Sequence, residues 1–109
     1  MAVQAFGILP RSPVSGERYD TYEPERYGCV AVDDRWVEPL AEKLREVPVC
    51  WHALDLTGKG LDACGITLLP PASIPAVLAA LDASEAWTAL GGLLEEARAR
   101  GRFVIHFGL

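Results

Sequence analysis

Short apolar runs and longer amphipathic stretches alternate along the chain, and they predict strands and helices in turn. The short runs are rich in Val, Ile, Phe and Cys, most of which favour a pleated, half-buried backbone. A Gly, Pro or Asp residue lies at the end of most of these runs, as is usual where strands end. We expect a strand or an ordered arm at 2–9, and strands at 29–32, 47–56, 66–69 and 103–107, with 47–56 in the centre of the sheet.

Three stretches have the period of an amphipathic helix. Trp36, Leu40 and Leu44 recur every four residues, and two aspartates before them can cap a helix over 36–46. Apolar residues at helical spacing after Ser73 predict a second helix. A third helix is expected to open at a capping residue within 82–85 and to end at Gly101, with the glycines at 91 and 92 marking a kink, a close contact or a break.

This order of elements predicts the fold class. A chain of 109 residues suffices for one compact domain, so 1–109 is expected to be a single domain. Strands interspersed with three helices favour an α/β or α+β two-layer sandwich, with a mixed sheet of three to five strands. The links between strands on either side of the helices are long enough for parallel crossovers, which is why a mixed sheet is expected.

Between the first two strands lies a long polar segment, 10–27, which we predict to be a loop because its prolines and glycine interrupt regular structure. All three tyrosines of the chain fall within it, interleaved with arginine and acidic residues. Tyr and Arg are enriched where proteins bind partners. We therefore predict partner-binding roles for Arg18, Tyr19, Tyr22, Arg26 and Tyr27.

A net charge of -5 argues against non-specific binding to nucleic acid or to an anionic membrane surface, both of which need a cationic face. No apolar stretch approaches the roughly 20 residues that span a bilayer. Three cysteines without CxxC spacing predict no disulfide framework and favour a reducing cytoplasm. The spacing of the Cys and His residues is poor for a metal site, and we expect no metal and no cofactor.

Cys50, Trp51 and His52 form the sharpest candidate for chemistry. Alternate residues of a strand share a face, so the thiol of Cys50 and the imidazole of His52 are expected side by side. A small thiol-dependent enzyme would use Cys50 as nucleophile, His52 or His106 as base and Asp55 to orient the base. A buried cysteine and a hydrogen-bonded histidine explain the same pattern without catalysis. Trp51 would then face the other side of the sheet, where it would be an interface anchor if uncovered.

Binding is the function that this sequence favours over catalysis. We expect a small acidic protein-binding module, of the inhibitor or immunity type or forming a homodimer through an open face of its sheet. The enzyme that uses Cys50 and His52 is the alternative. A small-ligand binder with a pocket between the sheet and Trp87 is a third class with no polar signature in the sequence.

Overall fold

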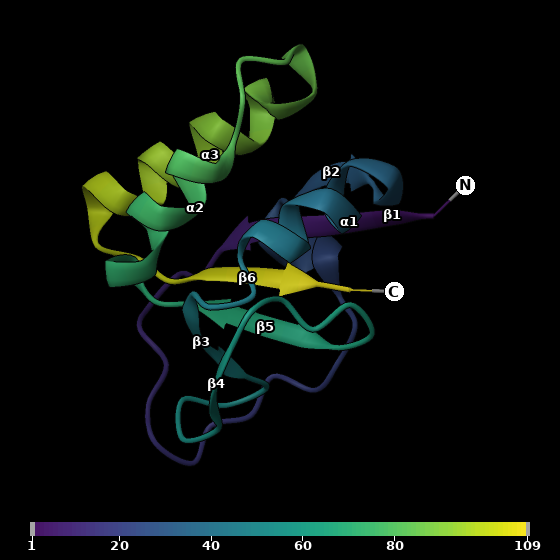
Figure 1. Ribbon diagram of the computed structural model, residues 1–109. Coiled ribbons are helices and arrows are strands. Elements are labelled where there is room, and N and C mark those ends of the chain that lie inside the picture. Colours follow the sequence, from purple (N-terminus) through teal and green to yellow (C-terminus); the bar gives the residue numbers. More distant parts are fainter. Residues whose placement is uncertain (1, 109) are drawn as a thin grey trace.

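Six strands form one sheet, with three helices against it, in a computed structural model that describes residues 2–108 (Figure 1). The strands are β1 Val3–Ile8, β2 Val30–Asp33, β3 Pro48–Trp51, β4 Thr57–Lys59, β5 Ile66–Leu69 and β6 Val104–Phe107. The helices are α1 Asp34–Lys43, α2 Ile74–Ala80 and α3 Thr88–Arg100, with short 3-10 turns at Pro24–Tyr27, Pro71–Ser73 and Glu85–Trp87.

The sheet order is β2-β1-β6-β5-β3-β4, and every neighbouring pair within residues 2–108 is antiparallel. Two expectations are therefore wrong: the sheet has six strands instead of three to five, and it is not mixed. The long link from β5 to β6 contains two helices, so the chain leaves the sheet at Leu69 and re-enters it directly opposite, at Val104. A single crossover helix would have brought the chain back as a parallel strand, whereas a pair of helices returns it to the same end of the strands, so that β6 runs antiparallel to β5.

The region 47–56 is the other correction. It is not a long central strand, because β3 ends at Trp51 and pairs with the edge strand β4. His52 follows with a φ of 63°, the only non-glycine residue in the described chain with a positive φ. This left-handed conformation is incompatible with a continuing strand, so the backbone turns there and forms a hairpin.

Local sequence signals set the ends of the helices. The carboxylate of Asp33 accepts a hydrogen bond from the Arg35 backbone N–H and caps α1, as expected. Ser84 caps the 3-10 turn that leads into α3. The glycines at 91 and 92 do not break α3, and neither is required by a close contact: a Cβ at Gly91 would lie 3.9 Å from Leu81, and one at Gly92 would meet open space.

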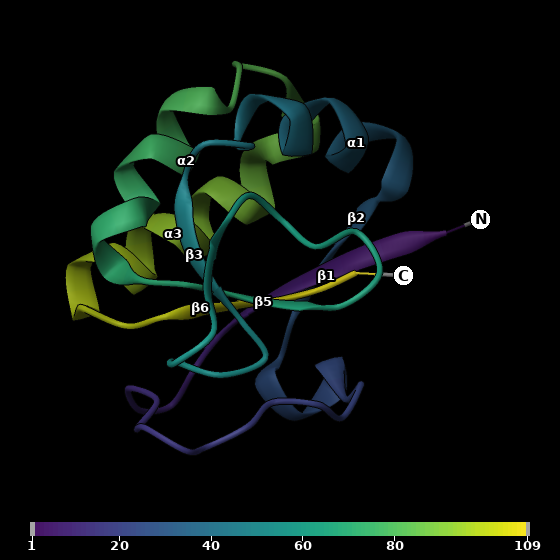
Figure 2. The same cartoon turned by 60° about the horizontal axis from the view of Figure 1, so that its bottom comes forward.

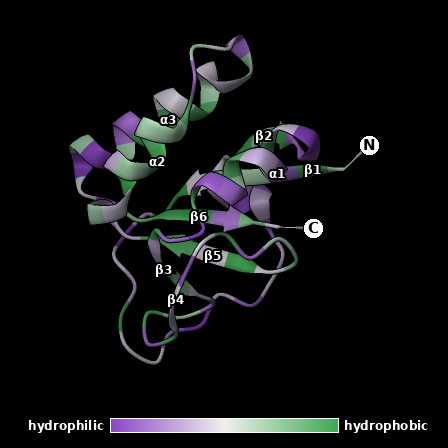
Figure 3. Ribbon diagram, viewed as in Figure 1, coloured by the Kyte–Doolittle hydropathy of each residue, from purple (hydrophilic) through white to green (hydrophobic). Residues whose placement is uncertain are grey.

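Both faces of the sheet are covered, and each cover buries its own apolar cluster. The helices lie on one face over a cluster that includes Phe6, Leu69 and Leu94. The polar segment 10–27 passes across the other face, where Ile105 and Phe107 are buried (Figure 2). The central strands that separate the two clusters are largely hydrophobic (Figure 3). In the described residues, no helix combines the length and the apolar character that crossing a membrane requires.

Candidate functional site

Segment 10–27 is an ordered layer attached to the turn after β3. The Asp55 carboxylate accepts hydrogen bonds from the Ser15 hydroxyl at 2.9 Å and from the Gly16 backbone N–H at 3.1 Å. The Tyr19 backbone N–H donates to the carbonyl of His52 at 2.6 Å, and Arg18 forms an isolated β-bridge with Ala53. These bonds join positions about 33 to 40 apart in the sequence and fix where the segment crosses the sheet.

The three tyrosines of the segment have different surroundings. Tyr19 and Tyr27 are half-buried against the second apolar cluster, and the Tyr27 ring lies 6.0 Å from that of Phe107. Tyr22 meets Phe107 edge-on at 5.4 Å but remains 56% exposed. Tyr19 and Tyr27 thus serve as part of the apolar cover, while Tyr22 offers most of its surface to solvent.

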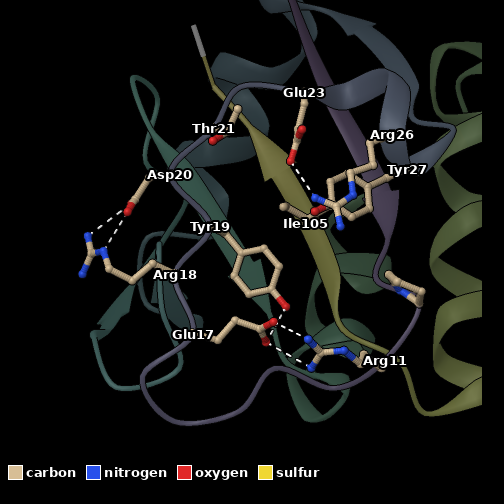
Figure 4. A pocket seen from close by; sticks show the side chains of 11 residues that line it. Arg11, Glu17, Arg18, Tyr19, Asp20, Thr21, Glu23, Arg26, Tyr27 and Ile105 are labelled. Carbon is tan, nitrogen blue, oxygen red and sulfur yellow. Dashed lines mark hydrogen bonds and ion pairs between the residues drawn. The ribbon is translucent and has the colours of Figure 1, made fainter.

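Tyr19 and Tyr27 are also walls of a hollow of about 210 Å³ (Figure 4). Ile105 of β6 lies between the two rings and provides an apolar floor. Charged side chains surround the opening, and the remaining lining residues are Pro10, Arg11, Glu17, Arg18, Asp20, Thr21, Glu23 and Arg26. Four of the six predicted partner-binding residues, Arg18, Tyr19, Arg26 and Tyr27, therefore line one cavity.

Hydrogen bonds neutralise the charges at one end of this hollow. Glu17 accepts from both terminal nitrogens of Arg11 and, at 2.9 Å, from the Tyr19 hydroxyl. The bonds from Tyr19 and Arg11 lower the pKa of Glu17. Burial, and then the bond to this carboxylate, raise the pKa of Tyr19 to about 12. Tyr19 is accordingly a neutral donor with a fixed ring position.

The other charged groups also form pairs within the segment. Arg18 donates to Asp20 at 2.7 Å, and Arg26 donates to Glu23 at 3.0 Å. The Arg26 guanidinium also lies 5.6 Å from the centre of the Tyr27 ring, in a cation–π contact. Each guanidinium of the segment thus already has a carboxylate partner.

Trp51, the sixth predicted partner-binding residue, lies apart from the hollow. Its side chain packs with the cluster on the helix-covered face of the sheet. The ring covers Gly58 of β4, where a Cβ would overlap it, and the indole N–H donates to the Gly60 carbonyl at 3.1 Å. Trp51 is half-buried, and its ring and N–H both have partners inside the protein.

The proposed catalytic residues do not form a chain of hydrogen bonds. Cys50 is buried in the second apolar cluster, and burial followed by the charge of Asp55 raises the pKa of its thiol. The Nδ1 atom of His52 lies 3.0 Å from Asp20 and 3.2 Å from the Tyr19 carbonyl. Asp55 instead holds Ser15 and Gly16. Within residues 2–108, no hydrogen bond joins Cys50 to His52.

His106 lies at the centre of a buried polar network that sequence patterns did not reveal. It is fully buried on β6, and its Nε2 is 2.6 Å from the side-chain oxygen of Gln4. The amide nitrogen of Gln4 donates to Asp34 at 2.5 Å, so the amide oxygen faces His106 and Nε2 carries the proton. Burial lowers the pKa of His106 to about 4, and its Nδ1 has no hydrogen-bond partner.

A metal site finds no support in the described residues. No group of three or more His, Cys, Asp or Glu side chains is arranged to hold a metal ion there. All three cysteines are free; Cys64 is exposed and Cys29 is half-buried. At the end of α3, Arg98 and Arg100 pair with glutamates of the same helix.

Comparison with protein-family models, with curated proteins and with solved structures gave no match in any of the three. Interpretation of the site therefore depends on its own geometry.

Proposed function

We propose that this protein is a small protein-binding module and that it binds its partner with the outer surface of segment 10–27. The observation that carries the proposal is the hollow between Tyr19 and Tyr27, which the bonds from Asp55 and His52 hold in an ordered layer. A binding surface that is already ordered loses less conformational entropy when a partner arrives. The exposed side chains beside it, Arg18, Tyr22 and Arg26, are of types that dominate binding energy at interfaces.

A different protein is favoured over a second copy of this chain. The homodimer hypothesis needed an open face of the sheet, and segment 10–27 covers the face that the helices leave free. Three free cysteines and the acidic balance fit a partner met in a reducing cytoplasm.

The test is capture of the partner from lysate of the native host, followed by calorimetry with the purified partner. The variant carries Arg18→Gln, Tyr22→Ala and Arg26→Gln, because these side chains are exposed and their loss leaves the walls and floor of the hollow in place. We expect a stoichiometric partner of the natural protein whose affinity falls at least about tenfold in the variant.

A control variant changes residues of the same kinds on the helix layer: Arg35→Gln, Trp36→Ala and Arg98→Gln. Arg35 lies over the Trp36 ring at 5.9 Å, much as Arg26 lies over Tyr27, so the control removes a comparable contact. Its affinity should stay within about twofold of the natural protein. Equal affinity in both variants, with both folded, would show that the partner binds elsewhere.

A further inference from the structure

We infer that the hollow between Tyr19 and Tyr27 receives a cationic side chain, in the first place an arginine, from a basic protein partner. This inference rests on the proposed function and adds the chemistry of the partner. Two aromatic walls and an apolar floor at Ile105 provide the surface on which a planar guanidinium stacks.

The Tyr27 wall already holds a guanidinium. Arg26 of the same chain lies over the Tyr27 ring while one of its nitrogens donates to Glu23 Oε1. Within the described residues, Glu23 Oε2 accepts no hydrogen bond, although the residue lines the hollow. A carboxylate accepts about four hydrogen bonds, so Glu23 can bind a second guanidinium without losing Arg26.

The charge of the surrounding surface favours a cation. Segment 10–27 and the turn 52–55 together carry three arginines and five carboxylates. Each arginine is paired inside the segment, whereas Glu25 and Asp55 have no cationic partner among residues 2–108. Segment 10–27 and the turn 52–55 thus have an excess of two negative charges, which Arg102, whose guanidinium donates to the Pro10 carbonyl at the margin, lowers to one. A surface that is negative on balance attracts a basic partner.

Three small probes test the inference: the acetylated amides of arginine, citrulline and glutamate, each titrated against the full chain and followed by amide NMR. Citrulline has the shape of arginine without its charge. We expect the arginine probe to shift the resonances of Tyr19, Tyr27 and Ile105 and to bind about two- to fivefold more tightly than citrulline.

Glu23→Gln removes one carboxylate partner of the guanidinium and should weaken binding of the arginine probe by a similar factor, about two- to fivefold. The control is Glu95→Gln, because Glu95 pairs with Arg98 three residues away at 2.8 Å, as Glu23 pairs with Arg26 at 3.0 Å. It should leave the affinity unchanged. Both variants change only exposed or half-exposed side chains, so we expect both to fold as the natural protein does.

Equal binding of arginine and citrulline would overturn the inference, and so would shifts that occur only outside the hollow. Preferential binding of the glutamate probe would overturn it as well, and would assign the hollow to an anion held by Arg11 and Arg26. Neither result would remove the proposed function, which fails only if changing the exposed residues of segment 10–27 leaves partner binding intact.

Discussion

Mild acid should destabilise this protein through His106. The imidazole is fully buried, and its pKa falls from an ordinary value of 6.5 to about 4 because burial penalises the charged form. The gap between these values corresponds, at about 1.4 kcal/mol per pH unit, to about 3 kcal/mol of unfolding free energy.

The sign follows from where the proton binds. Between pH 6.5 and 4 the unfolded chain takes up a proton that the folded chain refuses, so the free energy of unfolding falls as the pH is lowered. The contribution of the neutral His106 imidazole to the free energy of unfolding is complete above pH 6.5 and is lost progressively as the pH falls toward 4. Between pH 8 and pH 5 the expected loss is about 2 kcal/mol. The negative charge of Asp62 opposes the shift and is included in the pKa.

Urea unfolding followed by tryptophan fluorescence measures this loss across pH 4.5 to 8. The matched variant is His106→Gln, whose amide can still donate to the Gln4 oxygen but does not titrate. All other titratable groups are common to both proteins, so the difference between their unfolding free energies isolates His106. If that difference stays constant from pH 8 to pH 5, the reasoning is refuted. Should the variant fail to fold, the NMR titration of the imidazole gives its pKa directly.

Three further substitutions test other parts of the structure. His52→Gly removes the imidazole bonds to segment 10–27 and should speed alkylation of the buried Cys50 about tenfold relative to exposed Cys64. The control His52→Asn tolerates the positive φ and keeps a hydrogen-bond donor, so it should not change this rate. Equal Cys50 alkylation rates in the natural protein and in His52→Gly would show that this histidine does not hold the segment. Gly58→Ala places a Cβ within the tryptophan ring of β3 and should cost about 1 to 3 kcal/mol in urea unfolding. Gly92→Ala meets open space in the middle of α3 and should stabilise by about 1 kcal/mol; a loss of stability would contradict the helical geometry there.

Patterns that depend on neighbours in the sequence predicted several of the helices and strands and their ends. β5 spans Ile66–Leu69 as expected, because prolines stop an apolar run there, and the caps at Asp33 and Ser84 follow from their side chains. The errors arose where the sequence carries no distinctive signal for the structure that forms. The hairpin of β3 and β4 depends on the backbone of His52 and on a glycine under Trp51, neither of which has a distinctive local pattern.

The candidate site shows the same division. The composition of segment 10–27 pointed to Arg18, Tyr19, Arg26 and Tyr27, which line one hollow. Alternation along a strand also put Trp51 on the face opposite Cys50, but it could not tell that helices cover that face. The floor at Ile105 is contributed by β6, about 80 residues away, and only the folded sheet brings it under the tyrosines.

The pairing of β1 with β6 has a consequence for how the protein is made. These strands lie side by side within the sheet, and the Gln4–His106 contact joins positions 102 apart. In a nascent chain that lacks β6, β1 and β5 have no strand between them, so the sheet is incomplete until synthesis has passed residue 107. Contacts of such long range slow folding and leave strand edges exposed meanwhile. We therefore expect this sheet to be completed only after β6 has been synthesised, and chains truncated before β6 to aggregate.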